Sequence, residues 1–218
     1  MTTDPWPGEQ PTMSLDGANL HAKGLRTRNS LLQAAEEVFA ESGWEVASIV
    51  KITERAGVSQ GTFYRYFPSK RAIFDELIDD LNRRVRRSMA EGSAGARSRA
   101  EAERGGFEGF FRFTSEHPAL YRIIRQAEFA SPEAMHRHYE RISIGYREAL
   151  EAAMEAGQIA AGDPEVLAYA LMGVGELIGM RWILWSDTQP ADGTAPSIPP
   201  HVLDEVSRFV ARGLGIAE

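Results

Sequence analysis

Apolar residues recur at every third or fourth position along most of the chain, which is the spacing of one face of an α-helix. The pattern is clear in residues 26–42, where Leu31, Val38 and Phe39 share one face. Gly43 follows directly and is typical of a helix end. No alternation of apolar and polar residues competes with this pattern, so we expect an all-α protein.

Capping residues and prolines divide the rest of the chain into further helices. Ser48 and Ser59 are good N-caps, and Ser131 and Asp163 each precede a proline that suits a first helical position. The helices predicted from these signals span residues 49–56, 60–67, 70–90, 100–116, 118–129, 132–156, 164–185 and 201–214. The proline-rich residues 186–200 are predicted to form an exposed loop.

Composition divides the chain into three predicted regions. Residues 1–20, rich in Pro, Gly, Thr and acid, are expected to be a disordered tail; they lack the Lys or Arg of a minor-groove arm. Residues 21–69 are predicted to form a helix-turn-helix domain, and residues 70–218 a larger helical domain for ligand binding and dimerisation. The net charge of the whole chain is −7, yet residues 21–71 carry a balance of +3. A basic small domain on an acidic large one suits a selective DNA-binding protein better than a general nucleic-acid coat.

Residues 48–67 have the pattern of a helix-turn-helix, with two short helices around the turn Gly57-Val58-Ser59. The positions expected to face inward are Ile49, Ile52, Ala56, Val58, Phe63 and Phe67. The uncharged outward edge of the second helix is suited to reading base edges in the major groove. We therefore expect this segment to bind DNA.

Each outward residue of the second helix can serve a different contact. Gln60 can pair with adenine, and Thr62 can meet a thymine methyl group or a phosphate. Tyr64 and Tyr66 can donate hydrogen bonds to phosphates, and Gly61 lets the DNA backbone come close. The alternative is a surface helical hairpin with ordinary aromatic residues.

Two features at the ends of the second helix add to this interface. The helix N-terminus, which begins at Ser59, favours a phosphate, and Lys70 offers a point charge to the DNA backbone. A further basic cluster, on the helix that leaves the domain, is better interpreted as a solvated face than as a phosphate contact; it comprises Arg83, Arg84, Arg86 and Arg87.

Residues 26–77 resemble the DNA-binding domain of the TetR family. The resemblance rests on the segments Val38-Phe39-Ala40-Glu41-Ser42-Gly43, Ala56-Gly57-Val58-Ser59 and Gly61-Thr62-Phe63-Tyr64-Arg65-Tyr66-Phe67-Pro68-Ser69-Lys70. It implies contacts with DNA at Thr27, Ser48, Gln60, Thr62, Tyr64, Tyr66 and Lys70. This sequence departs from many members at Val50, where they have a polar or basic residue, so a base contact there is left to a thymine methyl group.

The carboxy-terminal part is rich in aromatic and branched apolar residues, which is how sites for hydrophobic small molecules are built. The candidate lining residues are Phe107, Phe110, Phe111, Tyr121, Ile124, Phe129, Tyr139, Ile142 and Tyr146. Arg125 or Gln126 could anchor a polar head group, and Glu176 is a further polar candidate. For any single one of these residues, ordinary core packing is the stronger interpretation.

Residues 164–185 are apolar almost all round, so we expect this helix to be buried on its own domain and on a partner subunit. Its glycines allow close helix approach, and the last helix is its expected companion in a homodimer. The predicted interface residues are Gly175, Gly179, Trp182, Val206 and Phe209.

Other residue types narrow the function classes. The chain has no cysteine, and the spacing of His117, His136 and His138 fits no metal site, so we expect neither a metal nor a cofactor. No signal peptide or uninterrupted membrane-length apolar stretch is evident, so we expect no membrane partner and a cytoplasmic location. No nucleophile elbow, phosphate loop or paired-carboxylate motif supports an enzyme.

These features together predict a regulator rather than an enzyme. The expected function is repression of transcription by a homodimer on palindromic double-stranded operator DNA, with release by a hydrophobic small molecule. The helix at 70–90, which joins both predicted domains, is the expected lever. The alternatives are an activator, a DNA-binding regulator that needs no ligand and, with less support, an α-helical enzyme.

Overall fold

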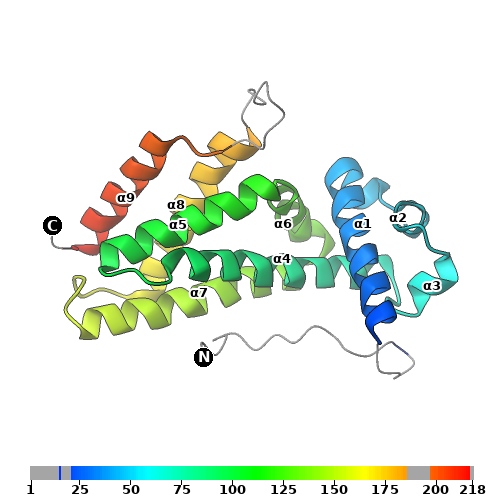
Figure 1. The fold of residues 1–218 in the computed structure, drawn as a ribbon, viewed down its shortest axis with the longest axis horizontal. Helices are drawn as coiled ribbons and strands as arrows, with labels where there is room; N and C mark the ends of the chain where they lie inside the picture. The colour runs from blue at the N-terminus through cyan, green and yellow to red at the C-terminus, as the bar shows by residue number, and fades with distance from the viewer. Residues whose placement is uncertain (1–14, 16–20, 186–196, 217–218) are drawn as a thin grey trace. The chain divides into compact units, whose positions relative to one another are not determined.

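The structure, a computed structural model, describes residues 15, 21–185 and 197–216. All regular secondary structure in this part of the chain is helical, which confirms the all-α prediction (Figure 1). The predicted tail falls outside the described residues except for Leu15, whose backbone N–H donates to the carbonyl of Arg65 (3.1 Å). Most of the predicted proline-rich loop, residues 186–196, is likewise outside them.

The helices agree closely with the sequence pattern. They are α1 (Ala22–Val46), α2 (Ile49–Ala56), α3 (Gln60–Tyr64), α4 (Lys70–Ser93), α5 (Arg99–Glu116), α6 (Ala119–Ala130), α7 (Pro132–Glu155), α8 (Pro164–Gly179) and α9 (Pro200–Leu214), with a π-helical turn, η1 (Met180–Leu184), that continues α8. Helix α1 is interrupted at Gly43, where φ is 74°, so the predicted end of its regular part is confirmed. The predicted helix at 60–67 is shorter than expected, because turns follow Tyr64.

The chain forms two compact units. The first comprises Met1–Arg83 and Arg122–Ala134, and the second comprises Arg84–Tyr121 and Met135–Glu218. Helix α4 therefore contributes its first half to one unit and its second half to the other. The division predicted from composition, at residue 70, stays a prediction.

The core of the first unit is aromatic and lies between α1, α2, α3 and the start of α4. Phe39 and Phe74 meet edge to face, with ring centroids 4.9 Å apart, and Trp44 packs against both rings. Ile52 of α2 and Phe63 of α3 are fully buried. This core holds the two short helices of the predicted helix-turn-helix, which are too short to be stable alone.

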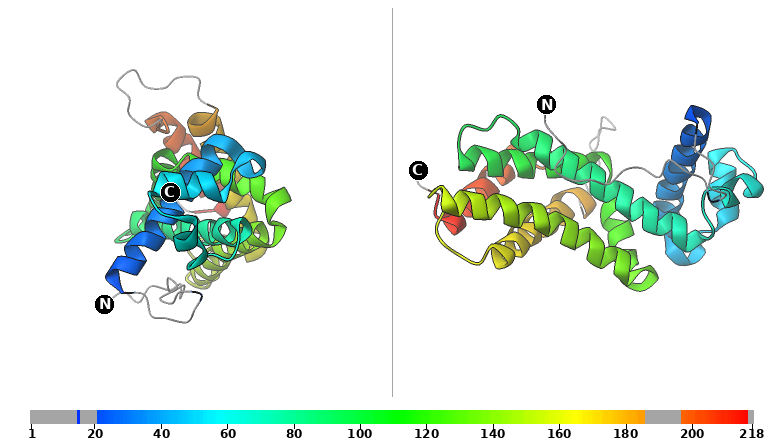
Figure 2. Two further views of the ribbon diagram at one scale, coloured as in Figure 1. Left: turned by 90° about the vertical axis from the view of Figure 1, so that its right-hand side faces the viewer. Right: turned by 90° about the horizontal axis from the view of Figure 1, so that it is seen from below.

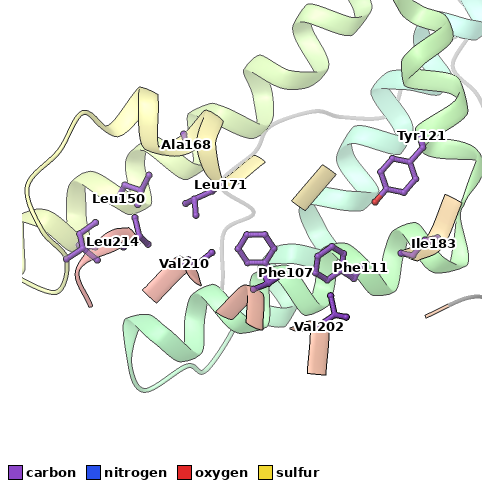
Figure 3. Packing of buried hydrophobic residues seen from close by; sticks show 13 residues of the cluster. Phe107, Phe111, Tyr121, Leu150, Ala168, Leu171, Ile183, Val202, Val210 and Leu214 are labelled. Carbon is purple, nitrogen blue, oxygen red and sulfur yellow. The ribbon is translucent and has the colours of Figure 1, made fainter. Parts of the chain in front are cut away.

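The core of the second unit gathers side chains from α5, α7, α8, η1 and α9. Figure 3 shows Phe107 and Phe111 of α5 near the middle of this cluster, with Val202 and Val210 of α9 and Leu171 of α8 around them. Helices α8 and α9 both pack on α5. The second half of α4 runs beside α7, as both Figure 1 and Figure 2 show. Most aromatic residues of this unit therefore serve as core.

Helices α4 and α5 approach each other closely through glycines. A Cβ atom added at Gly105 would lie 2.1 Å from the carbonyl oxygen of Gly92, and one at Gly109 would lie 2.2 Å from that of Ser88. The hydroxyl of Ser88 donates to the carbonyl of Gly109 at 2.8 Å. Side chains larger than hydrogen are therefore excluded at this crossing.

Candidate nucleic-acid interface and effector site

Helix α2 begins and ends where the sequence predicted. The Ser48 hydroxyl accepts a hydrogen bond from the backbone N–H of Lys51 (3.2 Å), and Gly57 closes the helix in the left-handed conformation, with φ of 67°. Ser48 is thus confirmed as an N-cap. The DNA contact expected from it stays a prediction, and its hydroxyl proton remains available as a donor to a phosphate.

Helix α3 is set by a second cap of the same kind. The Ser59 hydroxyl accepts from the backbone N–H of Thr62 (3.2 Å) and also lies 3.0 Å from the Thr62 hydroxyl. Phe63 points into the core, where its ring is 5.6 Å from that of Phe67. These contacts fix which edge of α3 faces outward.

The outward edge of α3 holds the residues predicted to touch DNA. Gln60, Gly61 and Tyr64 are exposed, whereas Thr62 and Tyr66 are half-buried. The exposed residues come together on one face of a short helix with a free N-terminal turn, as a recognition helix requires. Their contacts with bases and phosphates remain predictions.

Two flanking positions complete the candidate interface. Thr27 on α1 is half-buried, and its hydroxyl donates to the carbonyl of Lys23 (3.1 Å), which leaves its lone pairs as acceptors only. Val50 is 44% exposed on α2, so this position presents an apolar side chain to solvent. An apolar contact is the one that this position can offer.

Lys70 is engaged within the fold. Its ammonium donates to the carbonyls of Trp44 (2.7 Å) and Ala47 (3.0 Å) and lies 4.3 Å from the centre of the Trp44 ring. The lysine therefore satisfies carbonyls at the end of α1, a structural role that sequence reasoning missed. One of its three protons is left for the predicted phosphate contact.

Two arginines of the first unit, Arg55 and Arg28, form ion pairs. Arg55 bonds to Glu37 (2.8 Å) and Glu41 (2.8 Å) and so ties α2 to α1, and the pKa of the Glu41 carboxyl is lowered by this hydrogen bond. Arg28 is buried against Glu76, with its guanidinium 5.0 Å from the Phe67 ring. Arg28 and Arg55 therefore hold elements of the first unit together.

Comparison with known proteins bears on the function of this interface. Residues 31–77 match the family model of the bacterial regulatory proteins of the tetR family. The uncharacterized HTH-type transcriptional regulator YdgC of Bacillus subtilis (strain 168) is 31% identical over 177 residues, which cover 79% of this chain and 89% of YdgC. The chain belongs to the TetR family. It is a DNA-binding transcriptional regulator with a helix-turn-helix.

Two further similarities concern particular members of the TetR family. The HTH-type transcriptional activator FasR of Mycolicibacterium smegmatis is 32% identical over 108 residues, 48% of each chain. The structure of the transcriptional regulator FadR of Bacillus subtilis in complex with stearoyl-CoA superposes with a TM-score of 0.71 at 19% identity, covering 85% of this chain and 98% of FadR. The structural likeness shows a shared fold.

In this TetR-family chain, most predicted pocket residues of the second unit lie in or against its core. Phe107, Phe111 and Tyr121 are buried, and Phe110 and Tyr146 are partly buried beside them. Burial of Tyr146 raises the pKa of its hydroxyl well above the usual range, with the nearby Glu103 adding to the effect. Ile142 is also buried. A role for these side chains in ligand binding stays a prediction.

Four other candidates belong to the first unit. Phe129 is 85% exposed, so it lines no interior site, and its prediction as a lining residue is wrong. Ile124 is buried in the first unit, and Arg125 is exposed. Gln126, the suggested polar anchor, is hydrogen-bonded to α1: its side-chain oxygen accepts from the backbone N–H of Trp44 at 2.7 Å.

Glu176 has a defined partner inside the second unit. The Tyr139 hydroxyl lies 2.9 Å and 3.0 Å from its two carboxylate oxygens and donates to them. Both side chains are half-buried. A carboxylate and a phenol from two helices thus form a polar pair beside the apolar core.

The residues predicted for the dimer interface face different ways. Gly175 and Gly179 are buried against their own chain, where added Cβ atoms would lie 3.3 Å from Phe107 and 1.8 Å from the Tyr121 hydroxyl. Val206 is in the core as well, and Trp182 packs partly against it. Because these glycines admit aromatic rings of the same subunit, the structure assigns them an intramolecular role. Of the predicted set, Phe209 is prominently exposed, at 64%.

An exposed apolar stripe runs along the opposite side of α8. Val166, Tyr169 and Leu177 are exposed at helical spacing, and Gly173 between them has open space around it. The segment Pro164–Leu184 is long and apolar enough to cross a membrane by length and composition alone. The stripe explains that composition, because this helix is apolar toward the core and also toward the outside.

The basic cluster on α4 is not a solvated face. Arg84 bonds to the His117 ring (2.7 Å) and lies over Phe113, Arg83 pairs with Asp80 (2.8 Å), and Arg86 is buried. The interpretation of this cluster as solvated was therefore wrong for these three. Within the described residues, no group of three or more His, Cys, Asp or Glu side chains is placed to hold a metal ion.

Proposed function

We propose that this protein is a cytoplasmic, ligand-responsive repressor that binds palindromic operator DNA as a homodimer. The observation that carries the proposal is the exposed edge of α3, where Gln60, Gly61 and Tyr64 face solvent on a helix capped and held by its own unit. A recognition helix needs this combination of a rigid inner face and a free outer face.

The homodimer rests on the exposed stripe of α8 together with Phe209 of α9. Apolar side chains at Val166, Tyr169 and Leu177 are costly to leave in water, and a second copy of the same stripe covers them by two-fold symmetry. Gly173 allows the two backbones to approach closely at the centre of such a contact. Two recognition helices about 34–36 Å apart would then meet successive major grooves of a palindrome.

The ligand response rests on the aromatic side chains of the second unit and on α4. The aromatic side chains around Phe107 and Phe111 are of the kind that line sites for apolar molecules, and the related fold of FadR was solved with stearoyl-CoA. Helix α4 is continuous from Lys70 to Ser93 and contributes to both units. A ligand that favours one arrangement of the second unit can therefore bias the spacing of the recognition helices through this helix.

The direct test selects operators from random double-stranded DNA with the purified full-length protein. We expect an enriched palindrome, bound by a dimer, and a lower yield of transcript from a promoter that contains it in a purified transcription reaction. Small molecules that co-purify with the protein, identified by mass spectrometry, and stearoyl-CoA as a defined probe are then added. Release of the operator by either supports the ligand response.

Other outcomes would change the proposal in defined ways. A rise in transcript would make the protein an activator, as the name of FasR makes worth testing. An enriched site without palindromic symmetry would contradict binding as a symmetric dimer. Operator binding that no co-purified molecule alters would make the protein a ligand-independent regulator.

A further inference from the structure

Three polar side chains from three helices converge beside the aromatic core of the second unit. They are Tyr121 of α6, Tyr139 of α7 and Glu176 of α8. Tyr139 and Glu176 are half-buried, whereas Tyr121 is only 4% exposed. In Figure 3 its hydroxyl oxygen points toward the interior of the unit.

The hydroxyl of Tyr121 has no hydrogen-bond partner of normal geometry among the described residues. The nearby Thr114 hydroxyl donates its own proton to the carbonyls of Phe110 and Phe111 (3.0 and 3.2 Å). Burial raises the pKa of the Tyr121 hydroxyl well above its usual range, the Thr114 side chain lowers it in part, and the charge of Glu176 raises it further. A buried phenol without a partner is costly, since it has lost its hydration and gained no bond.

The fold makes specific room for this hydroxyl. A Cβ atom at Gly179 would lie 1.8 Å from the Tyr121 oxygen, so the absence of a side chain there admits the phenol against the backbone of α8. Gly179 is three residues from Glu176, which places both on adjacent turns of one helix face. Phe110 packs edge to face on the Tyr121 ring, with centroids 6.4 Å apart.

We propose that Tyr121, Tyr139 and Glu176 form the polar end of the effector site and select an apolar molecule that carries a hydrogen-bond donor, a hydroxyl or an amine, over one that carries a carboxylate. The inference rests on the proposed ligand response. It goes further by naming the chemistry that the effector must present.

The donor requirement follows from the hydrogen-bonding capacity of the three groups. The Glu176 carboxylate can only accept hydrogen bonds, and the Tyr139 hydroxyl already donates its proton to it. The lone pairs that remain on these oxygens can therefore accept only from a ligand that donates. A ligand hydroxyl can donate to Glu176 and accept from Tyr121, which satisfies the phenol. A ligand carboxylate would meet a like charge in an apolar setting, where repulsion is weakly screened.

The experiment compares three probes with the same twelve-carbon chain: 1-dodecanol, dodecylamine and dodecanoate. Binding to the full-length protein is measured by calorimetry below the solubility limit of dodecanol and below the micelle concentrations of the two ionic probes. Operator release is followed in parallel. We expect dodecanol and dodecylamine to bind at least about tenfold tighter than dodecanoate.

Two variants locate the selectivity. Glu176→Gln retains the acceptor for Tyr139 and the side-chain volume, and it should reduce the preference for dodecylamine over dodecanoate by about tenfold or more. Glu148→Gln, an exposed position on α7, makes the same change in net charge and should leave the preference unchanged. Tyr121→Phe should weaken the binding of dodecanol more than the binding of dodecylamine. It should not lower the midpoint of thermal unfolding, because the hydroxyl that it removes has no hydrogen-bond partner.

Three results overturn the inference: dodecanoate bound as tightly as the other probes, a preference that survives Glu176→Gln, or no binding of any probe. These results are distinct from a failure of the proposed function. Operator release by dodecanoate or stearoyl-CoA with no effect of Glu176→Gln would retain the ligand response and reject this site. Selective binding of dodecanol without operator release would retain this site and reject the ligand response.

Discussion

Helix α3 and helix α8 differ in how far their surroundings could be anticipated from their own residues. In α3 the inward Phe63 and the exposed Gln60 and Tyr64 separate cleanly, because Phe63 is wholly apolar and the other two side chains carry polar groups. Helix α8 is apolar in nearly every direction, so its sequence marks no single buried face. The buried face of a helix can therefore be predicted from its sequence when its two faces differ in polarity, and high hydrophobicity alone is not enough.

The same contrast holds for small residues. Gly57 acts through its own backbone conformation, with φ of 67°, and such a requirement is visible in a local turn pattern. Gly175 and Gly179 act through rings that come from α5 and α6. Their role depends on partners distant in the chain, and a small-residue motif alone could not distinguish a subunit contact from an internal one.

The largest expected effect tests the glycine crossing of α4 and α5. Gly109→Ala should lower the free energy of unfolding by about 3 kcal/mol, because its Cβ would clash with the backbone oxygen of Ser88. Gly213→Ala is the control, since nothing lies within 4 Å of its added Cβ. It should raise the free energy by about 0.5–1 kcal/mol. Urea unfolding measures the free energy of unfolding of both variants. If Gly109→Ala is as stable as Gly213→Ala, helices α4 and α5 do not pack as closely as described.

The second prediction decides between the two faces of α8. Leu177→Glu should raise the dimer dissociation constant roughly 100-fold, because two-fold symmetry places two carboxylates in one apolar contact. Sedimentation equilibrium measures the constant. Gln158→Glu, at an exposed turn, introduces the same charge away from the stripe and should leave it unchanged. An unchanged dissociation constant for Leu177→Glu would show that the dimer interface lies outside the α8 stripe.

The third prediction tests the exposed edge of α3. Gln60→Ala should weaken operator binding by about 1–3 kcal/mol, roughly 5- to 150-fold, and relax selection at one base pair. Thermal unfolding should be unchanged, since the side chain is exposed. Fluorescence anisotropy on matched and mismatched operators gives the affinities, with Gln158→Ala as the control. Uniform affinity loss on all sequences would indicate a phosphate contact in place of a base contact.

The fourth prediction separates the two roles of Lys70. Lys70→Ala should lower the free energy of unfolding by about 1–2 kcal/mol, because two carbonyls and the Trp44 ring lose their cation. It should also reduce the slope of log affinity against log salt by about 0.9, from the one remaining proton on a phosphate. Lower stability with an unchanged slope would leave only the structural role.

The smallest expected effect concerns His138, which is buried in the second unit. Burial lowers the pKa of His138 to about 3, with Arg86 and Arg141 adding to the effect, so the folded protein holds a neutral ring. The unfolded chain binds a proton near pH 6.5, and stability therefore falls as the pH drops below that value, by at most about 1.4 kcal/mol per unit. Urea unfolding from pH 7 to 5 should show this slope. His138→Gln should remove it, whereas His136→Gln at an exposed site should retain it.

The order of the helices and the recognition segment could be predicted from the sequence because their signals are local. Caps at Ser48 and Ser59 and the break at Gly43 each act within one turn of chain, and all three are found in the structure. The candidate effector residues could be named as a group, but Phe129 was wrong. Its exposure is decided by which elements cover α6, and periodicity carries no information about that.

The sequence by itself determined the all-α architecture, the order of the helices and the caps that begin α2 and α3, since backbone capping and amphipathic spacing are short-range effects. Only the tertiary structure decided which basic side chains are held by acceptors within the fold and which glycines pack against aromatic rings. Lys70, Arg55 and Arg28 are bonded to acceptors far along the chain. The pairing of Tyr139 with Glu176 likewise joins residues that the sequence leaves distant, because contact between helices depends on the packing of the whole unit.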